Sequence, residues 1–200
     1  MTILSVNKTR DFRWAHCAHF LFTGALRPFF CVTGKETMNK KARQLTHGAV
    51  LAAVYVILTH LQNFLFPNSA NMAVQFRLSE ALCVLAFFTP AAIPGLSLGC
   101  LLFNLTSGAA LPLDFLIGTA ATVLSTWCMW LTRKFTLKGY PLFGLLLPAL
   151  FNAVLVGWEL SVYIGGGFFL NAFLVGLGEA AVLLVPGSVL YFALRKRNLF

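Results

Sequence analysis

The chain has 200 residues, of which 58% are hydrophobic and only 10% are charged, and its formal net charge is +9. Soluble domains average about 25% charged residues, so this composition excludes a water-soluble enzyme and favours one membrane-embedded domain. The basic residues form short clusters at the ends of apolar segments instead of one stripe. This pattern indicates membrane topology and argues against nucleic-acid binding.

Residues 1–37 differ in composition from the rest of the chain. They mix charged side chains with one apolar stretch, residues 20–26, that is too short to span a bilayer or to form a signal-peptide core. Met38 is followed by Asn-Lys-Lys-Ala-Arg and a long apolar run, a common beginning for small membrane proteins. We therefore expect residues 38–200 to form the membrane domain. Residues 1–37 are either an extension ahead of the natural start or an amphipathic arm on the membrane surface.

A helix needs about 20 apolar residues to span a bilayer, and this length divides the remaining sequence. The first predicted helix covers residues 42–62. The segment 78–110 is long for one helix and short for two, and Pro90 and Pro94 would each break or kink a continuous helix. We therefore predict two short helices there, joined by a tight turn over residues 90–95. The other predicted segments are a loop over residues 63–77 and helices over residues 113–131, 142–163 and 168–194.

Charge asymmetry decides between five and six spans, because cytoplasmic loops and ends collect Lys and Arg. With six spans, three basic clusters fall on one side of the membrane. They are Lys35, Lys40, Lys41 and Arg43; Arg133, Lys134 and Lys138; and Arg195, Lys196 and Arg197. A single helix over residues 78–110 would place the second and third clusters outside. The sequence thus predicts an all-α integral membrane protein with six transmembrane helices and both termini in the cytoplasm.

Only four acidic residues follow Met38, namely Glu80, Asp114, Glu159 and Glu179. Charged groups inside a membrane are costly and usually mark a function. Glu80 and Asp114 lie near predicted helix ends, where an interfacial role is equally open. Glu159 and Glu179 lie deeper, and their own helices offer no cation between the flanking basic clusters, so these two are the stronger candidates.

The six-span topology gathers polar side chains in the outer half of the bundle. Arg77, Glu80, Asp114 and Glu159 lie toward the outer ends of their helices, and Glu179 lies near mid-membrane. Asn104, Asn152 and Asn171 fall in the same outer half or middle, and we expect all of these side chains to line a cavity open to the outside. Carboxylates and amides suit a small ligand that offers hydrogen-bond donors or a positive charge, and do not suit an anion. Among the aromatic residues, Trp158 is the one we favour as a ligand contact, although Trp is commonly an interfacial anchor.

Two short internal patterns accompany these residues. The sequence from Asn152 to Gly157 resembles that from Asn171 to Gly176, and a glutamate follows each. The two copies either line one pocket or reflect chance in an apolar sequence. In the first predicted helix, Ala49 and Ala53 form a small-xxx-small pair beside a second pair, Gly48 and Ala52, and such pairs allow close helix packing.

Motifs for other chemistries are missing from the sequence. It has no P-loop, metalloprotease motif or serine-nucleophile elbow, so an enzyme assignment lacks support. The five cysteines have no CxxC spacing and the four histidines form no HExxH pair, so we predict neither a metal site nor a cofactor.

Several segments resemble the QueT family, the substrate-binding S components of energy-coupling factor (ECF) transporters assigned to queuosine precursors. The most specific is Gln75-Phe76-Arg77-Leu78-Ser79-Glu80-Ala81-Leu82. The others are residues 90–100 with Asn104, Leu113-Asp114, and the stretch from Asn171 to Ala180. The resemblance covers about residues 38–195.

The resemblance implies an S component in the cell membrane whose energy comes from separate subunits. These are a transmembrane coupling subunit, expected to pack on Ala49 and Ala53, and two cytosolic ATPases. The substrate-binding residues it implies, together with those from the polar pattern, are Gln75, Phe76, Arg77, Glu80, Asn104, Asp114, Asn152, Trp158, Glu159, Asn171 and Glu179. A 7-deazaguanine fits them, since its ring N–H and amino group suit one carboxylate and an aminomethyl arm suits another.

Three alternatives stay open at this stage. The first is an S component for another small heterocycle or vitamin. The second is a membrane enzyme that uses Glu159 and Glu179 as acid and base. The third is a purely structural partner of another membrane complex, which would leave the outer polar residues without a purpose.

Overall fold

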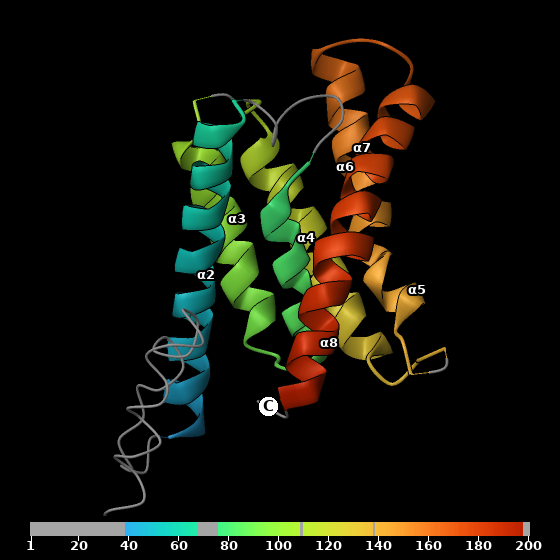
Figure 1. Cartoon of the computed structure of the whole chain (residues 1–200). Coiled ribbons are helices and arrows are strands. Elements are labelled where there is room, and N and C mark those ends of the chain that lie inside the picture. Colours follow the sequence, from blue (N-terminus) through green and yellow to red (C-terminus); the bar gives the residue numbers. More distant parts are fainter. Residues whose placement is uncertain (1–38, 68–75, 109, 138, 198–200) are drawn as a thin grey trace, which may run out of the picture. The chain divides into compact units, whose positions relative to one another are not determined.

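The computed structural model describes residues 39–67, 76–108, 110–137 and 139–197, so the expectations for residues 1–37 and for Gln75 lie outside the described residues. The regular elements of the described residues are all helical (Figure 1). They are α2 (Lys40–Leu65), η1 (Leu78–Phe87), α3 (Ala92–Thr106), α4 (Asp114–Thr132), α5 (Leu142–Leu145), α6 (Leu147–Tyr163), α7 (Phe168–Val182), η2 (Leu183–Gly187) and α8 (Ser188–Arg197). The predicted all-helical fold is thereby confirmed for this part of the chain.

Small residues set the spacing between helices α2 and α3. A Cβ atom on Gly95 of α3 would lie 2.6 Å from the carbonyl oxygen of Gly48 on α2. One turn further along, a Cβ atom on Gly99 would lie 3.0 Å from the carbonyl oxygen of Ala52. The Gly48 and Ala52 pair therefore packs inside the protein, because only residues without bulk allow this approach.

The segment from Leu78 to Thr106 forms two short helices, as predicted, but with a different boundary between them. Helix α3 begins at Ala92 and includes Pro94 in its first turn, where a missing N–H leaves no hydrogen bond unmade. The expected turn over residues 90–95 was therefore placed too late, and the chain reverses over residues 88–91. Element η1 is a 3₁₀ helix, and it packs against α2, α3, α4, α7, η2 and α8.

Prolines also interrupt the last two predicted spans. The helix expected over residues 142–163 divides at Leu146, where Pro148 occupies the first turn of α6. The helix expected over residues 168–194 continues to Arg197, with a π-helical turn, η2, around Pro186. A π turn absorbs the N–H that proline lacks without ending the helix.

Among the described residues, four helical stretches are long and apolar enough to cross a membrane, namely Lys40–Leu65, Asp114–Thr132, Leu142–Tyr163 and Phe168–Lys196. The other two of the six predicted spans are shorter. At about 2.0 Å per residue for a 3₁₀ helix and about 1.5 Å for an α-helix, η1 and α3 each extend only about 20 Å. A hydrocarbon core is about 30 Å thick, so neither of them crosses it alone as a straight helix.

Apart from the buried Arg77, the Lys and Arg residues of the described chain lie at one end of the bundle. The start of α2, the α4–α5 connection and the end of α8 lie together at the lower end in Figure 1. The Arg195 guanidinium donates a hydrogen bond to the Gly139 carbonyl oxygen, and the Tyr140 and Ser188 hydroxyls are hydrogen-bonded nearby. The α4–α5 connection is thereby attached to α8.

Candidate functional site

Six polar side chains from different elements are buried inside the helical bundle. We call them the polar cluster: Arg77, Glu80, Asn104, Asp114, Glu159 and Glu179, each at most 5% exposed. They come from the start of η1, the end of α3, the start of α4, and from α6 and α7. All six were predicted as site residues, and the fold brings them together.

Arg77 is held at the start of η1 by its neighbours in the chain. The Gln62 side chain of α2 accepts a hydrogen bond from the Leu78 N–H at 2.7 Å and donates one to the Phe76 carbonyl oxygen. These two bonds fix the backbone on both sides of Arg77. The guanidinium then reaches the Asn104 side-chain oxygen at 3.5 Å and lies 5.7 Å from the centre of the Phe103 ring.

Asn104 connects Arg77 to the first turn of α4. Its amide nitrogen donates to the Asp114 carbonyl oxygen at 2.8 Å. Gly118, one turn further along α4, leaves the space that this amide occupies, because a Cβ atom there would lie 2.8 Å from the Asn104 nitrogen. The Asp114 carboxylate accepts a bond from the Leu111 N–H at 2.9 Å through Oδ2, and its other oxygen stays open.

Glu80 has a different environment, because protein donors occupy both of its oxygens. The Tyr55 hydroxyl donates to Oε1 at 2.5 Å and the Cys83 thiol donates to Oε2 at 3.1 Å. A second polar contact between the same two elements joins Thr59 to Ser79 at 2.8 Å. Glu80 thereby attaches η1 to α2, which is a structural role.

The other three carboxyl groups of the polar cluster carry five buried oxygens without a hydrogen-bond partner among the described residues. These oxygens are Asp114 Oδ1, both oxygens of Glu159 and both of Glu179. Asp114 and Arg77 act electrostatically on Glu159, and Glu80 and Arg77 act on Glu179. A buried charged carboxylate without hydrogen-bond donors is strongly unfavourable. These carboxyl groups therefore need either hydrogen-bond donors from a ligand or protonation.

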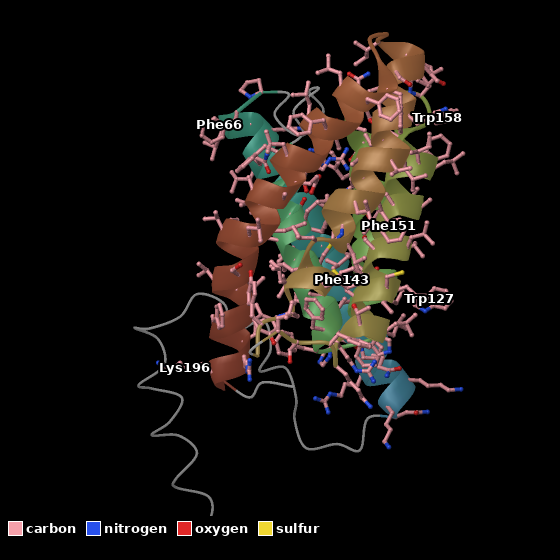
Figure 2. The ribbon with its side chains drawn as sticks, turned by 90° about the vertical axis from the view of Figure 1, so that its right-hand side faces the viewer. Phe66, Trp127, Phe143, Phe151, Trp158 and Lys196 are labelled. Carbon is pink, nitrogen blue, oxygen red and sulfur yellow. The ribbon has the colours of Figure 1, made fainter. Side chains whose placement is uncertain are left out.

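The other predicted site residues that the structure describes lie outside the polar cluster. Asn152 is buried on α6, and Asn171 donates to the Gly165 carbonyl oxygen at 3.0 Å, closing the α6–α7 connection. Phe76 is 44% exposed and Trp158 is 52% exposed. Figure 2 shows Trp158 projecting outward on the same side as Trp127. Consecutive residues of an α-helix point about 100° apart, so the helix rotation that buries Glu159 turns Trp158 outward. The expected contact of Trp158 with the ligand stays a prediction.

The internal repeat of α6 and α7 has a packing explanation. A Cβ atom on Gly157 would lie 2.7 Å from the Ala172 Cα, and one on Gly176 would lie 3.2 Å from the Ala153 Cβ. Each Ala of one copy therefore contacts the Gly of the other. This pairing is expected when two similar sequences lie on antiparallel helices, because the end of one copy then meets the beginning of the other. This contact brings α6 and α7 close together and leaves Glu159 and Glu179 buried.

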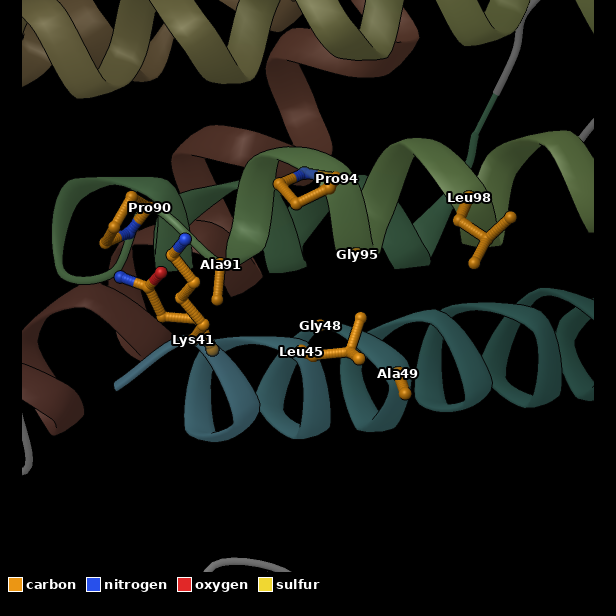
Figure 3. A pocket seen from close by; sticks show the side chains of 10 residues that line it. Lys41, Leu45, Gly48, Ala49, Pro90, Ala91, Pro94, Gly95 and Leu98 are labelled. Atoms are coloured by element: carbon orange, nitrogen blue, oxygen red, sulfur yellow. The ribbon is translucent and has the colours of Figure 1, made fainter. Parts of the chain in front are cut away.

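The second small-residue pair of α2 points away from the bundle. Ala49 and Ala53 are exposed, unlike Gly48 and Ala52 on the neighbouring face. Ala49 also borders a groove of about 350 Å³ between α2 and the start of α3, which Figure 3 shows at the point where Gly48 and Gly95 face each other. The groove is apolar apart from Lys41 and Gln44.

Three residues of this region were missed by reasoning from the sequence: Tyr55, Gln62 and Gly118. Tyr55 and Gln62 belong to a predicted span of mostly apolar residues, and only their polar atoms there could have drawn attention to them. Gly118 carries no sequence signal, because its role is to leave space for a side chain from another helix.

Comparison with known proteins identifies one family. The family model described as QueT transporter matches residues 45–196, which confirms the resemblance carried by the segment around Arg77 and Glu80. No curated protein and no solved structure matches the chain. The transporter family and the apolar helices long enough to span a bilayer show that this is a multi-pass membrane protein.

Proposed function

The chain belongs to the QueT transporter family, and from this premise we propose that it is the substrate-binding S component of an ECF-type importer for a queuosine precursor. The ligand is a 7-deazaguanine, in the aminomethyl or cyano form or as queuine. It binds in the polar cluster. The protein has no cofactor of its own, and ATP is used by partner subunits.

The observation that carries this proposal is the set of five open carboxylate oxygens on Asp114, Glu159 and Glu179. Arg77 is the basic residue of the polar cluster, and it acts electrostatically on both Glu159 and Glu179. Acceptors thus exceed donors in a buried site, and a ligand rich in N–H groups supplies what is missing. A site of this kind rejects ligands without donors, because its own acceptors would stay unpaired.

A substrate-binding component also needs a surface for its energising partner. We assign that role to the exposed face of α2 with Ala49 and Ala53, next to the groove between α2 and α3. Small residues let a helix of a transmembrane coupling subunit approach closely. Two cytosolic ATPase subunits bind that subunit in turn. We expect six membrane-embedded segments in the S component, with both of its termini in the cytoplasm.

Isothermal titration calorimetry of the detergent-solubilised protein tests the ligand assignment. We expect saturable binding of 7-aminomethyl-7-deazaguanine and much weaker binding of guanine. We expect Glu179→Gln to weaken binding of the aminomethyl compound by more than tenfold. A carboxylate accepts hydrogen bonds through both of its oxygens, whereas the amide has one accepting oxygen and an NH2 group that can only donate.

The control is the thermal unfolding temperature of the variant without ligand. A folded Glu179→Gln protein with unchanged affinity would remove Glu179 from the site. Binding only of an unrelated vitamin, such as riboflavin or thiamine, would replace the queuosine precursor by that compound. Conversion of the ligand by the isolated protein would point to an enzyme instead.

A further inference from the structure

The open oxygens of the polar cluster divide into two sets of different size. One set has three oxygens, Asp114 Oδ1 and both oxygens of Glu159, which act on each other electrostatically. The other set has the two oxygens of the Glu179 carboxylate, whose acidic neighbour Glu80 is already occupied by Tyr55 and Cys83. The positive charge of Arg77 acts on both Glu159 and Glu179, so the two sets share this one guanidinium.

The two sets also differ in depth along their helices. Glu159 lies four residues before the end of α6, and Glu179 lies eleven residues after the start of α7. At about 1.5 Å per residue, Glu179 is roughly 10 Å deeper than Glu159, measured from the α6–α7 connection. Asp114, the first residue of α4, belongs to the shallow set.

Donor geometry assigns a part of the ligand to each set. One carboxylate with two open oxygens matches a planar edge with two parallel N–H donors, the arrangement of a bidentate pair. Three open oxygens on two acidic side chains match an ammonium group, which has three donors and one positive charge. Two neighbouring buried carboxyl groups repel each other when both are charged, and the Arg77 charge is shared with Glu179, so an ammonium group stabilises this set most.

We propose that Glu179 binds the ring N–H and exocyclic amino group of the base, while Asp114 and Glu159 together bind a primary ammonium group on its side arm. This assignment rests on the proposed function and extends it, since it selects a cationic 7-deazaguanine over neutral forms. The base edge lies deepest in the bundle and the cation lies nearer the outer ends of α4 and α6. The ammonium group is therefore the determinant of specificity at the entrance.

A matrix of three ligands and three proteins tests the assignment by calorimetry. The ligands are 7-aminomethyl-7-deazaguanine, 7-deazaguanine without the arm, and 7-aminomethyl-7-deazahypoxanthine without the exocyclic amino group. The proteins are the wild type, Glu159→Gln and Glu179→Gln. In the wild type we expect removal of either ligand group to weaken binding by at least tenfold.

Each variant is expected to lose sensitivity to one ligand group alone. Removal of the arm should change the affinity of Glu159→Gln by less than threefold, and removal of the amino group should change that of Glu179→Gln by less than threefold. The opposite pairing, or equal sensitivity of both variants to both groups, would overturn the assignment and leave the proposed function intact. Failure of the wild type to bind any of the three compounds would overturn the proposed function itself.

A second variant protects the test against misfolding. Asp114→Asn retains an oxygen that can accept the Leu111 N–H and should show the same loss of sensitivity to the arm as Glu159→Gln. If Asp114→Asn and Glu159→Gln differ, with both folded by their thermal unfolding temperatures, the shared ammonium site is overturned.

Discussion

At the scale of single residues, the site depends on the absence of a side chain at Gly118. Gly118 has no Cβ, and the Asn104 amide occupies the space that a Cβ would fill. From there Asn104 bonds the start of α4 and the Arg77 guanidinium. The position of the Arg77 guanidinium therefore depends on Gly118, which contributes only the space that the Asn104 amide occupies.

We predict that Gly118→Ala weakens ligand binding by about tenfold, the equivalent of roughly 1.4 kcal/mol. The added Cβ would lie 2.8 Å from the Asn104 nitrogen, so the amide must move away from Asp114 and Arg77. Calorimetric titration measures the effect. Gly108→Ala is the matched control, because a Cβ at Gly108 meets nothing within 4 Å and should leave affinity unchanged. Equal affinities of the two variants would contradict the role of Gly118.

At the scale of elements, the crossing of α6 and α7 places two of the acidic side chains. The copies of the repeated sequence contact each other through Gly157 with Ala172 and Gly176 with Ala153. Glycine in a helix interior costs about 0.5–1 kcal/mol relative to alanine, so its presence at these points indicates a packing requirement. The repeat was predicted to line one pocket or to be chance. The contacts show that both copies allow the close approach of two helices, and their lining of one pocket stays a prediction.

Gly157→Ala is expected to lower stability by about 1–3 kcal/mol, because the new methyl group would meet the backbone of Ala172 at 2.7 Å. Backbone atoms cannot rotate away as a side chain can. Thermal unfolding in detergent, followed by far-UV circular dichroism, should show a lower Tm than the wild type. Gly167→Ala provides the comparison, since nothing lies within 4 Å of its added Cβ and its φ of -77° suits any residue. An unchanged Tm for Gly157→Ala would disprove the tight crossing.

At the scale of the whole molecule, one helix separates the two surfaces that a transporter subunit needs. The inner face of α2 bonds Glu80 through Tyr55 and the backbone on both sides of Arg77 through Gln62, and its outer face presents Ala49 and Ala53. In the proposed function, ligand binding and partner binding therefore involve opposite faces of α2. Substitutions on the outer face should separate the two activities.

We expect Ala49→Leu to abolish co-purification with the transmembrane coupling subunit while ligand affinity stays within twofold of the wild type. The larger side chain would fill the approach to the groove, and Ala49 is exposed, so the fold should tolerate it. Ala120→Leu, a matched change at an exposed position of α4, should leave complex formation intact. Loss of the complex in both variants, or in neither, would argue against the α2 face.

The proposed orientation in the membrane can be tested with single cysteines. In a background with Cys17, Cys31 and Cys128 replaced by Ser, a membrane-impermeant maleimide added to intact cells should label Gly167→Cys in the α6–α7 connection. Lys134→Cys, in the basic α4–α5 connection, should be labelled only after permeabilisation, as the positive-inside rule requires. The reverse pattern would invert the topology, and labelling of both positions in intact cells would contradict it.

Much of this protein was determined by its sequence alone. Apolar length and proline positions predicted the four long spans and the pair of short helices within residues 78–110, because these properties depend on local composition. The family was predicted from short motifs such as residues 75–82. The scarcity of acidic residues also singled out Glu80, Asp114, Glu159 and Glu179, since a charged group in a membrane needs a reason.

The tertiary structure alone decided which of these residues are alike. Glu80 is occupied by Tyr55 and Cys83, whereas Asp114, Glu159 and Glu179 keep open oxygens, and Trp158 faces outward although Glu159 beside it is buried. It also decided which small-residue pair of α2 packs inside and which stays exposed. These distinctions depend on the rotation of each helix about its axis and on contacts between residues far apart in the chain, which apolar sequences of low complexity do not encode in any local pattern.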